Sequence, residues 1–123
     1  AKEDWRDNAK KVNVDHLIQF KVFDAKDMPF EHNTFDAIFF LGSLHHIAKE
    51  YRANVLHECM RISNSSAIIC FLEPNQKAIK RIKKKKPSHP DAADPNEYIQ
   101  GLNLASQKME GAFFDAFIFQ KTK

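Results

Sequence analysis

Glycine is scarce in this sequence: the 123 residues contain only three, Gly42, Gly101 and Gly111, and they are far apart. A turn that wraps backbone N–H groups around a ligand needs several glycines within a few residues, because only glycine allows such a close approach. These 123 residues therefore contain no glycine-rich ligand-binding turn.

Cysteine and long apolar runs are also scarce. The two cysteines, Cys59 and Cys70, fall within predicted helical and strand segments, which favours free buried thiols in a reducing compartment over a disulfide. No apolar run is long enough to cross a membrane. The first residues lack the basic and apolar regions of a signal peptide. We therefore expect a cytoplasmic location and no membrane partner.

Hydrophobic residues make up 43% of the chain, and eleven residues are phenylalanine. This content is sufficient for the core of one small domain, so we expect residues 1–123 to form a single domain. The net charge of +3 is localised, because seven basic and no acidic residues lie between Lys77 and Lys86. No aromatic residues alternate with the lysines of the run Lys80–Lys86, so we interpret it as a solvated helix face and do not expect nucleic acid as a partner.

Three segments are typical of strands in an α/β protein. Residues 18–22 alternate between apolar and polar side chains, which predicts a half-buried strand that ends at Asp24. Residues 37–41 and 67–72 are apolar throughout, as in parallel strands that are covered on both faces. Ligands in such sheets bind beyond the carboxyl ends of the strands, so the polar residues that follow these segments form a candidate site.

Helices are predicted at residues 2–11, 47–62 and 76–86, where the composition or periodicity favours them. The second helix carries the clearest apolar stripe, formed by Tyr51, Val55, Leu56, Cys59 and Met60.

The connections and the C-terminal segment are also predictable. Residues 63–66 are expected to form a turn, with Asn64 in the left-handed conformation. Residues 102–109 and 113–120, on either side of a turn at Glu110 and Gly111, predict an antiparallel hairpin at the sheet edge.

Four motifs share one family's order and spacing. They are Asp24-Ala25-Lys26-Asp27-Met28-Pro29-Phe30, Thr34-Phe35-Asp36-Ala37-Ile38, Leu44-His45-His46 and Glu73-Pro74-Asn75. Together they resemble class I S-adenosylmethionine-dependent methyltransferases, in particular the ubiquinone- and menaquinone-biosynthesis type (methyltransferase type 11). The resemblance covers about residues 10–75, and the last predicted strand fits it as well. It implies a partial Rossmann-like sheet of mostly parallel strands, S-adenosylmethionine as cofactor and a small-molecule acceptor.

The resemblance also implies that part of the family's domain is not in these residues. The family binds the methionine end of its cofactor with a Gly-x-Gly-x-Gly turn after its first strand. It binds the ribose with an acidic residue after its second strand. Neither feature has a counterpart here, so we expect a truncated domain without the first two strands. The strand at residues 18–22 would then have lost its neighbours, so it would pair directly with the strand at residues 37–41, pair across a dimer or stay loose. We expect rearranged pairing or homo-oligomerisation through an unpaired sheet edge.

The resemblance assigns cofactor binding to residues at two strand ends. Asp24 and the backbone of Ala25 would bind adenine, Met28 would lie against the adenine face, and Leu41 and Gly42 would lie near the sulfonium. An alternative for Asp24 is a turn aspartate that caps nearby N–H groups.

The same resemblance places acceptor-facing residues after the turn at Ser43. His45 or His46 can act as the general base, because imidazole titrates near neutral pH, and we expect at most one of these neighbours to point into the site. The alternative is a packing or helix-start role for both. Ser43, Glu73 and Asn75 are candidates for substrate binding, although Asn75 can equally be a helix cap.

No metal is expected from the sequence. The spacing of His45, His46, His57 and Cys59 matches no strong zinc pattern. Two functional hypotheses remain. The chain is either the C-terminal part of a methyltransferase catalytic domain or a non-catalytic methyltransferase-like module that binds a partner or oligomerises.

Overall fold

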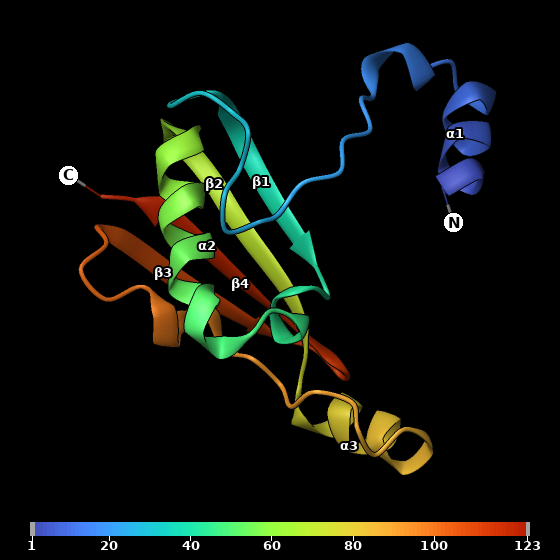
Figure 1. The fold of residues 1–123 in the computed structure, drawn as a ribbon, viewed down its shortest axis with the longest axis vertical. Helices are drawn as coiled ribbons and strands as arrows, with labels where there is room; N and C mark the ends of the chain where they lie inside the picture. Colours follow the sequence, from blue (N-terminus) through green and yellow to red (C-terminus); the bar gives the residue numbers. More distant parts are fainter. Residues whose placement is uncertain (1, 123) are drawn as a thin grey trace.

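The computed structural model describes residues 2–122, which form a four-stranded sheet with helices (Figure 1). In chain order the elements are α1 (Lys2–Lys11), η1 (Asp15–Leu17), β1 (Phe35–Leu41), η2 (Leu44–His46), α2 (Lys49–Ile62), β2 (Ser63–Pro74), α3 (Gln76–Lys85), η3 (Pro95–Tyr98), β3 (Leu104–Glu110) and β4 (Phe114–Lys121), where η denotes a 3-10 helix.

The strand order in the sheet is β1-β2-β4-β3. β1 and β2 are parallel, with Ala37 beside Ile68 and Leu41 beside Leu72. β2 pairs with β4, and β4 with β3, in antiparallel fashion, so the predicted hairpin is present at one edge of the sheet. The α/β fold class is thereby confirmed. The expected predominance of parallel strands is not, because one pairing of the described sheet is parallel and two are antiparallel.

α2 connects the two parallel strands and covers one face of the sheet (Figure 1). Its predicted apolar stripe supplies the buried residues Val55, Leu56 and Cys59, which belong to the same core as Phe71 and Phe119 of the sheet. Each fully buried large side chain of this kind stabilises the fold by about 1.5–3 kcal/mol. The helix periodicity therefore predicted this packing correctly, although Tyr51 at the helix start is partly exposed.

The opposite face of the sheet is open at β1, which corrects the prediction that residues 37–41 are covered on both faces. Phe39 is 65% exposed and Leu41 is 72% exposed, whereas Ile38 and Phe40 pack against the core. A run of apolar residues cannot distinguish a strand covered on two faces from one covered on a single face, so the pattern alone did not predict the exposed face of β1.

The predicted strand at residues 18–22 is wrong. These residues follow η1 as an irregular segment that connects α1 to the sheet region without pairing with any strand (Figure 1). Val22 is 78% exposed, and Ile18 and Phe20 are also exposed. The alternation was that of a strand, but a strand also needs a neighbour for its backbone hydrogen bonds.

The predicted turn at residues 63–66 is also wrong, because β2 begins at Ser63 directly after α2. Asn64 is not among the non-glycine residues with positive φ, which are Asn13 and Asn33. Its side chain instead donates to Asp36 of β1 and accepts from the Ser66 N–H. These contacts fix Asn64 in the strand beside a register shift between Phe35 and Ala37.

Among residues 2–122, no helix combines the length and the apolar character that crossing a membrane requires.

Candidate functional site

The candidate site begins where β1 ends. Gly42 has a φ of +67°, in the left-handed region that side chains other than glycine rarely adopt, and its N–H donates to the Leu72 carbonyl at 2.7 Å. This sharp turn directs the chain from β1 into η2. The backbone therefore carries His45 and His46 past the carboxyl ends of the two parallel strands.

Glu73, near the end of β2, holds η2 in place. Its side chain is 1% exposed. Its carboxylate accepts from the Leu44 N–H at 3.2 Å, the His45 N–H at 2.9 Å and His45 Nδ1 at 3.1 Å. Hydrogen bonds to an ionised carboxylate are stronger than neutral ones, so this residue fixes both the backbone and one imidazole. Its oxygens are engaged inside the protein, and Glu73 thus positions His45 instead of offering a free carboxylate to an acceptor.

The proton on His45 follows from the same contact. Because the carboxylate accepts from Nδ1, that nitrogen carries the proton in the neutral ring and Nε2 is left with a lone pair. Arg52 of α2 adds a second restraint, since its Nη2 donates to the His45 carbonyl at 3.2 Å and its Nε donates to the Ile47 carbonyl at 2.8 Å. His45 is therefore buried, oriented and held from two elements.

Residues 42–46 form a corner between β1 and α2. His46 lies on the exposed side of this corner, in tilted ring contact with His45 at a centroid distance of 4.1 Å. Partial desolvation is the largest cause that lowers the pKa of His46, and the nearby His45 and His89 lower it further. The neutral ring is favoured at this position, and it is the form that can accept a proton or bind a metal.

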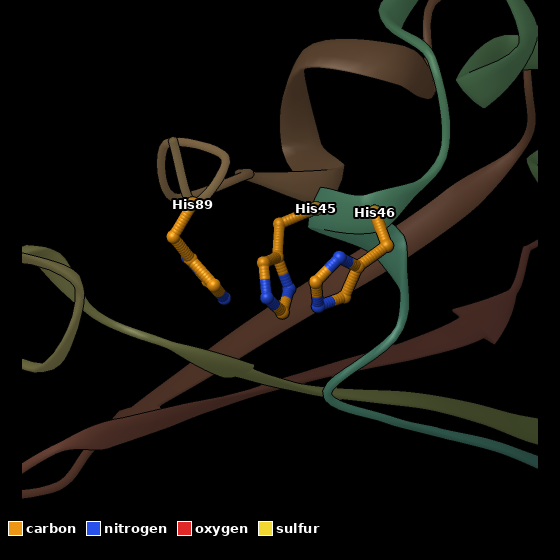
Figure 2. Close-up of side chains that lie close together, drawn as sticks. All are labelled: His45, His46 and His89. Atoms are coloured by element: carbon orange, nitrogen blue, oxygen red, sulfur yellow. The ribbon is translucent and has the colours of Figure 1, made fainter. Parts of the chain in front are cut away.

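A third histidine joins the cluster from a distant part of the chain. His89 lies in the proline-rich loop after α3, and its ring centroid is 5.2 Å from those of both His45 and His46. Figure 2 shows the three imidazole rings side by side, projecting to the same side of the backbone. Sequence reasoning missed His89, because only the path of the loop after α3 brings it beside η2.

This corner opens into a cavity of about 380 Å³. The histidines His45 and His46 and the turn residue Gly42 contribute to its wall. Its other lining residues are apolar: Leu41, Leu72, Pro74, Ile82 and Phe114. An apolar cavity with a few polar groups at one end is the usual form of a small-molecule site.

The residues predicted to bind adenine lie elsewhere. Asp24 is in an exposed turn, where it accepts from the Lys26 N–H at 3.0 Å and pairs with the Lys26 Nζ at 3.5 Å. The Lys26 backbone hydrogen bond is the largest cause that lowers the pKa of Asp24. These contacts are those of a turn-capping aspartate, the alternative that the sequence left open, and Asp24 borders neither this cavity nor the next.

Ala25 and Met28 border a second cavity, of about 520 Å³, beside β1. Met28 is 5% exposed and packs into the core, and its backbone is held by Glu58 and Arg61 of α2. The predicted cofactor residues are therefore divided between two cavities. Leu41 and Gly42 border the histidine cavity, and Ala25 and Met28 border the cavity beside β1.

The remaining predicted residues flank the corner. Ser43 is half-buried, and its carbonyl accepts from the His46 N–H at 3.1 Å. Asn75 caps α3: its Oδ1 accepts from the Ala78 N–H at 3.0 Å, and its Nδ2 donates to the carbonyls of Gly111 and Ala112 at 3.2 Å each. Asn75 thus has the cap contacts that were the alternative to substrate binding.

A parallel strand pair joined by a helix, continued by an antiparallel hairpin, is the part of the Rossmann-like class I methyltransferase fold that these residues describe. Residues 1–71, more than half of the chain, match the family model described as "Methyltransferase domain", and the chain belongs to this family. No curated protein matches the sequence.

Solved structures agree with this fold. A protein from Pyrococcus horikoshii is similar, with 17% identity, a TM-score of 0.72 and coverage of 95% of this chain and 65% of its own. Geranyl diphosphate C-methyltransferase from Streptomyces coelicolor, in complex with Mg²⁺, geranyl diphosphate and S-adenosyl-L-homocysteine, has 9% identity, a TM-score of 0.69 and coverage of 95% and 59%. An O-methyltransferase family protein from Burkholderia thailandensis has 12% identity, a TM-score of 0.76 and coverage of 99% and 41%.

These identities establish a shared fold and nothing finer. The chain spans 41% to 65% of the length of these three structures.

Proposed function

We propose that this chain forms the acceptor side of an S-adenosylmethionine-dependent methyltransferase that acts on a small molecule. The observation that carries the proposal is the η2 corner, which Glu73 holds over an apolar cavity at the carboxyl ends of β1 and β2. Geranyl diphosphate C-methyltransferase, which shares the fold, is described in complex with geranyl diphosphate and S-adenosyl-L-homocysteine.

The described residues fit only part of the cofactor. Leu41 and Gly42 would adjoin its sulfonium end, whereas Asp24, Ala25 and Met28 do not share a cavity with them. When bound, the cofactor supplies a methyl group already activated by positive charge on sulfur, so the protein mainly has to position the reactants and exclude water. The apolar lining of the histidine cavity supports that role for the acceptor.

The two predicted bases take different roles in this proposal. His46 is exposed toward solvent and the cavity, so it would accept a proton from an acceptor hydroxyl or amine. His45 is buried, with its Nδ1 bonded to Glu73, so it would orient the corner. Ser43 lies beside the two histidines, and its carbonyl accepts from the His46 N–H. Glu73 would contribute by orienting the His45 ring.

Calorimetric titration with S-adenosylhomocysteine tests the cofactor part of the proposal. We expect micromolar binding that a Leu41→Arg variant weakens at least tenfold, because Leu41 borders the cavity and is exposed enough to be replaced without disturbing the core. Met109→Arg, at an exposed position of the opposite edge strand, is the matched control. Absence of binding at millimolar ligand contradicts the proposal.

The alternative is a non-catalytic module that binds a partner or a second copy. The open sheet face with Phe39 and Leu41 at its edge favours it, because exposed apolar patches mark interaction surfaces. We also infer a cytoplasmic location under either function, since Cys59 and Cys70 are both free thiols, as expected in a reducing compartment.

A further inference from the structure

We propose that His45, His46 and His89 form a binding site for a divalent transition metal of the zinc type, with one coordination position open to the cavity. One ligand atom from each residue can be chosen so that all three lie within 4.8 Å of one another. They come from two segments separated by the whole of α2, β2 and α3, and their rings lie side by side (Figure 2).

The geometry requires a modest contraction. Zinc binds imidazole nitrogen at about 2.0–2.1 Å, so ligand nitrogens around a tetrahedral ion lie about 3.4 Å apart. His46 is exposed and His89 lies in a loop, so both side chains have room to turn toward the fixed ring of His45. The immobile member of the triad thus sets the place at which the metal binds.

Two of the three imidazoles already have the partners that metal-binding histidines use. His45 donates from Nδ1 to the Glu73 carboxylate at 3.1 Å, and His89 donates from Nδ1 to the Pro90 carbonyl at 2.9 Å. Such contacts fix the tautomer that leaves Nε2 free for a metal, and they orient the ring. Nothing in the proposed methyl transfer requires this arrangement at His89.

The ligand atoms, and not the charges around the cluster, favour one type of metal. Glu73 places a buried carboxylate behind His45, whereas Lys86 and the guanidinium of Arg52 place positive charge nearby. Net attraction for cations is therefore small, and affinity has to come from the nitrogen ligands. Imidazole suits zinc, copper, nickel and cobalt, while magnesium and calcium prefer oxygen, so the site favours the first group.

His45 and His46 both line the apolar cavity, so a metal held by them and His89 would lie at the cavity wall, with its fourth position open to the cavity. This inference goes beyond the proposed methyl transfer, because the metal site consists of residues of this chain alone and needs no cofactor. A metal bound to His46 would occupy the lone pair that otherwise accepts a proton, so the two roles of His46 exclude each other.

The test uses the chain without a polyhistidine tag, stripped of metal with a chelator. Calorimetry with Zn²⁺ should give one ion per chain, and Co²⁺ should give the intense visible absorption of a four-coordinate site. We expect His89→Ala and His46→Ala each to weaken Zn²⁺ binding more than tenfold. His57→Ala is the matched control, since His57 is an exposed histidine on α2 whose Nδ1 contacts the Ala53 carbonyl, and it should bind as the native chain does.

Three results would overturn the metal site. They are absence of Zn²⁺ binding at millimolar concentration, equal losses for His57→Ala and His89→Ala, and a Co²⁺ spectrum that His89→Ala leaves unchanged. His89 is a half-buried loop residue, so His89→Ala should keep the native circular dichroism and isolate the ligand effect. No methyl donor is used, so this failure is separate from a failure to bind S-adenosylhomocysteine.

Discussion

Glu73 is the residue on which the corner depends, because three N–H groups of η2 share its carboxylate in a fully buried position. Its role in positioning His45 was not predictable from the sequence. The sequence places Glu73 after an apolar strand, and that position is equally compatible with a carboxylate that faces a ligand. Which side the carboxylate faces depends on where the 3-10 helix passes, and that path is set by contacts distant in sequence.

We predict that Glu73→Ala lowers the free energy of unfolding by about 1–3 kcal/mol for each buried N–H that is left without an acceptor. Urea denaturation measures the loss. Glu110→Ala removes a carboxylate that is largely exposed at the end of β3 and should change stability by less than about 0.5 kcal/mol. Equal effects for the two variants would show that the Glu73 contacts do not stabilise the corner.

At the scale of the element, the turn after β1 depends on the left-handed backbone of Gly42. A β-carbon there would meet open space, so substitution acts through the backbone and not through a clash. We predict that Gly42→Ala destabilises the protein by about 1–2 kcal/mol, since the left-handed conformation costs other residues that much. Thermal denaturation measures the change.

Gly42→Asn provides the comparison. Asparagine tolerates left-handed backbone better than alanine does, so this variant should lose clearly less stability. If Gly42→Asn and Gly42→Ala lose the same amount, the backbone conformation is not the reason that glycine is needed in this turn.

The elements differ in how well local sequence predicted them. The predictions of α2 and of the β3–β4 hairpin were correct, because helical periodicity and a turn between alternating segments are local signals. The prediction of a strand at residues 18–22 was wrong, because a strand also requires a neighbouring strand, which its own residues do not encode. The prediction of a turn at residues 63–66 was wrong, because the Asn64 side chain donates to Asp36 of the neighbouring strand. This contact stabilises an extended backbone at Asn64 over a turn.

For the molecule as a whole, β1 is an edge strand with exposed apolar side chains, and residues 18–22 form no strand beside it. Unpaired backbone groups at such an edge are available to a second chain. We predict that this chain self-associates through β1 at rising concentration, which sedimentation velocity detects. Phe39→Lys should abolish association, because Phe39 is 65% exposed and a lysine there repels its own copy.

The control is Met109→Lys on β3, the other edge strand, where Met109 is 57% exposed. It should associate as the native chain does. A native chain that stays monomeric at all concentrations, or a loss of association in Met109→Lys alone, would remove β1 as the contact surface.

The link between Glu73 and His45 joins positions 28 residues apart, and it can form only after β2 lies alongside β1. The complete imidazole cluster consequently requires the folded arrangement, because His89 is distant in sequence from His45 and His46. Its ring resonances would serve as a built-in reporter of completed assembly. A chain that has formed α2 but not yet aligned its parallel strands would leave those signals at their random-coil positions.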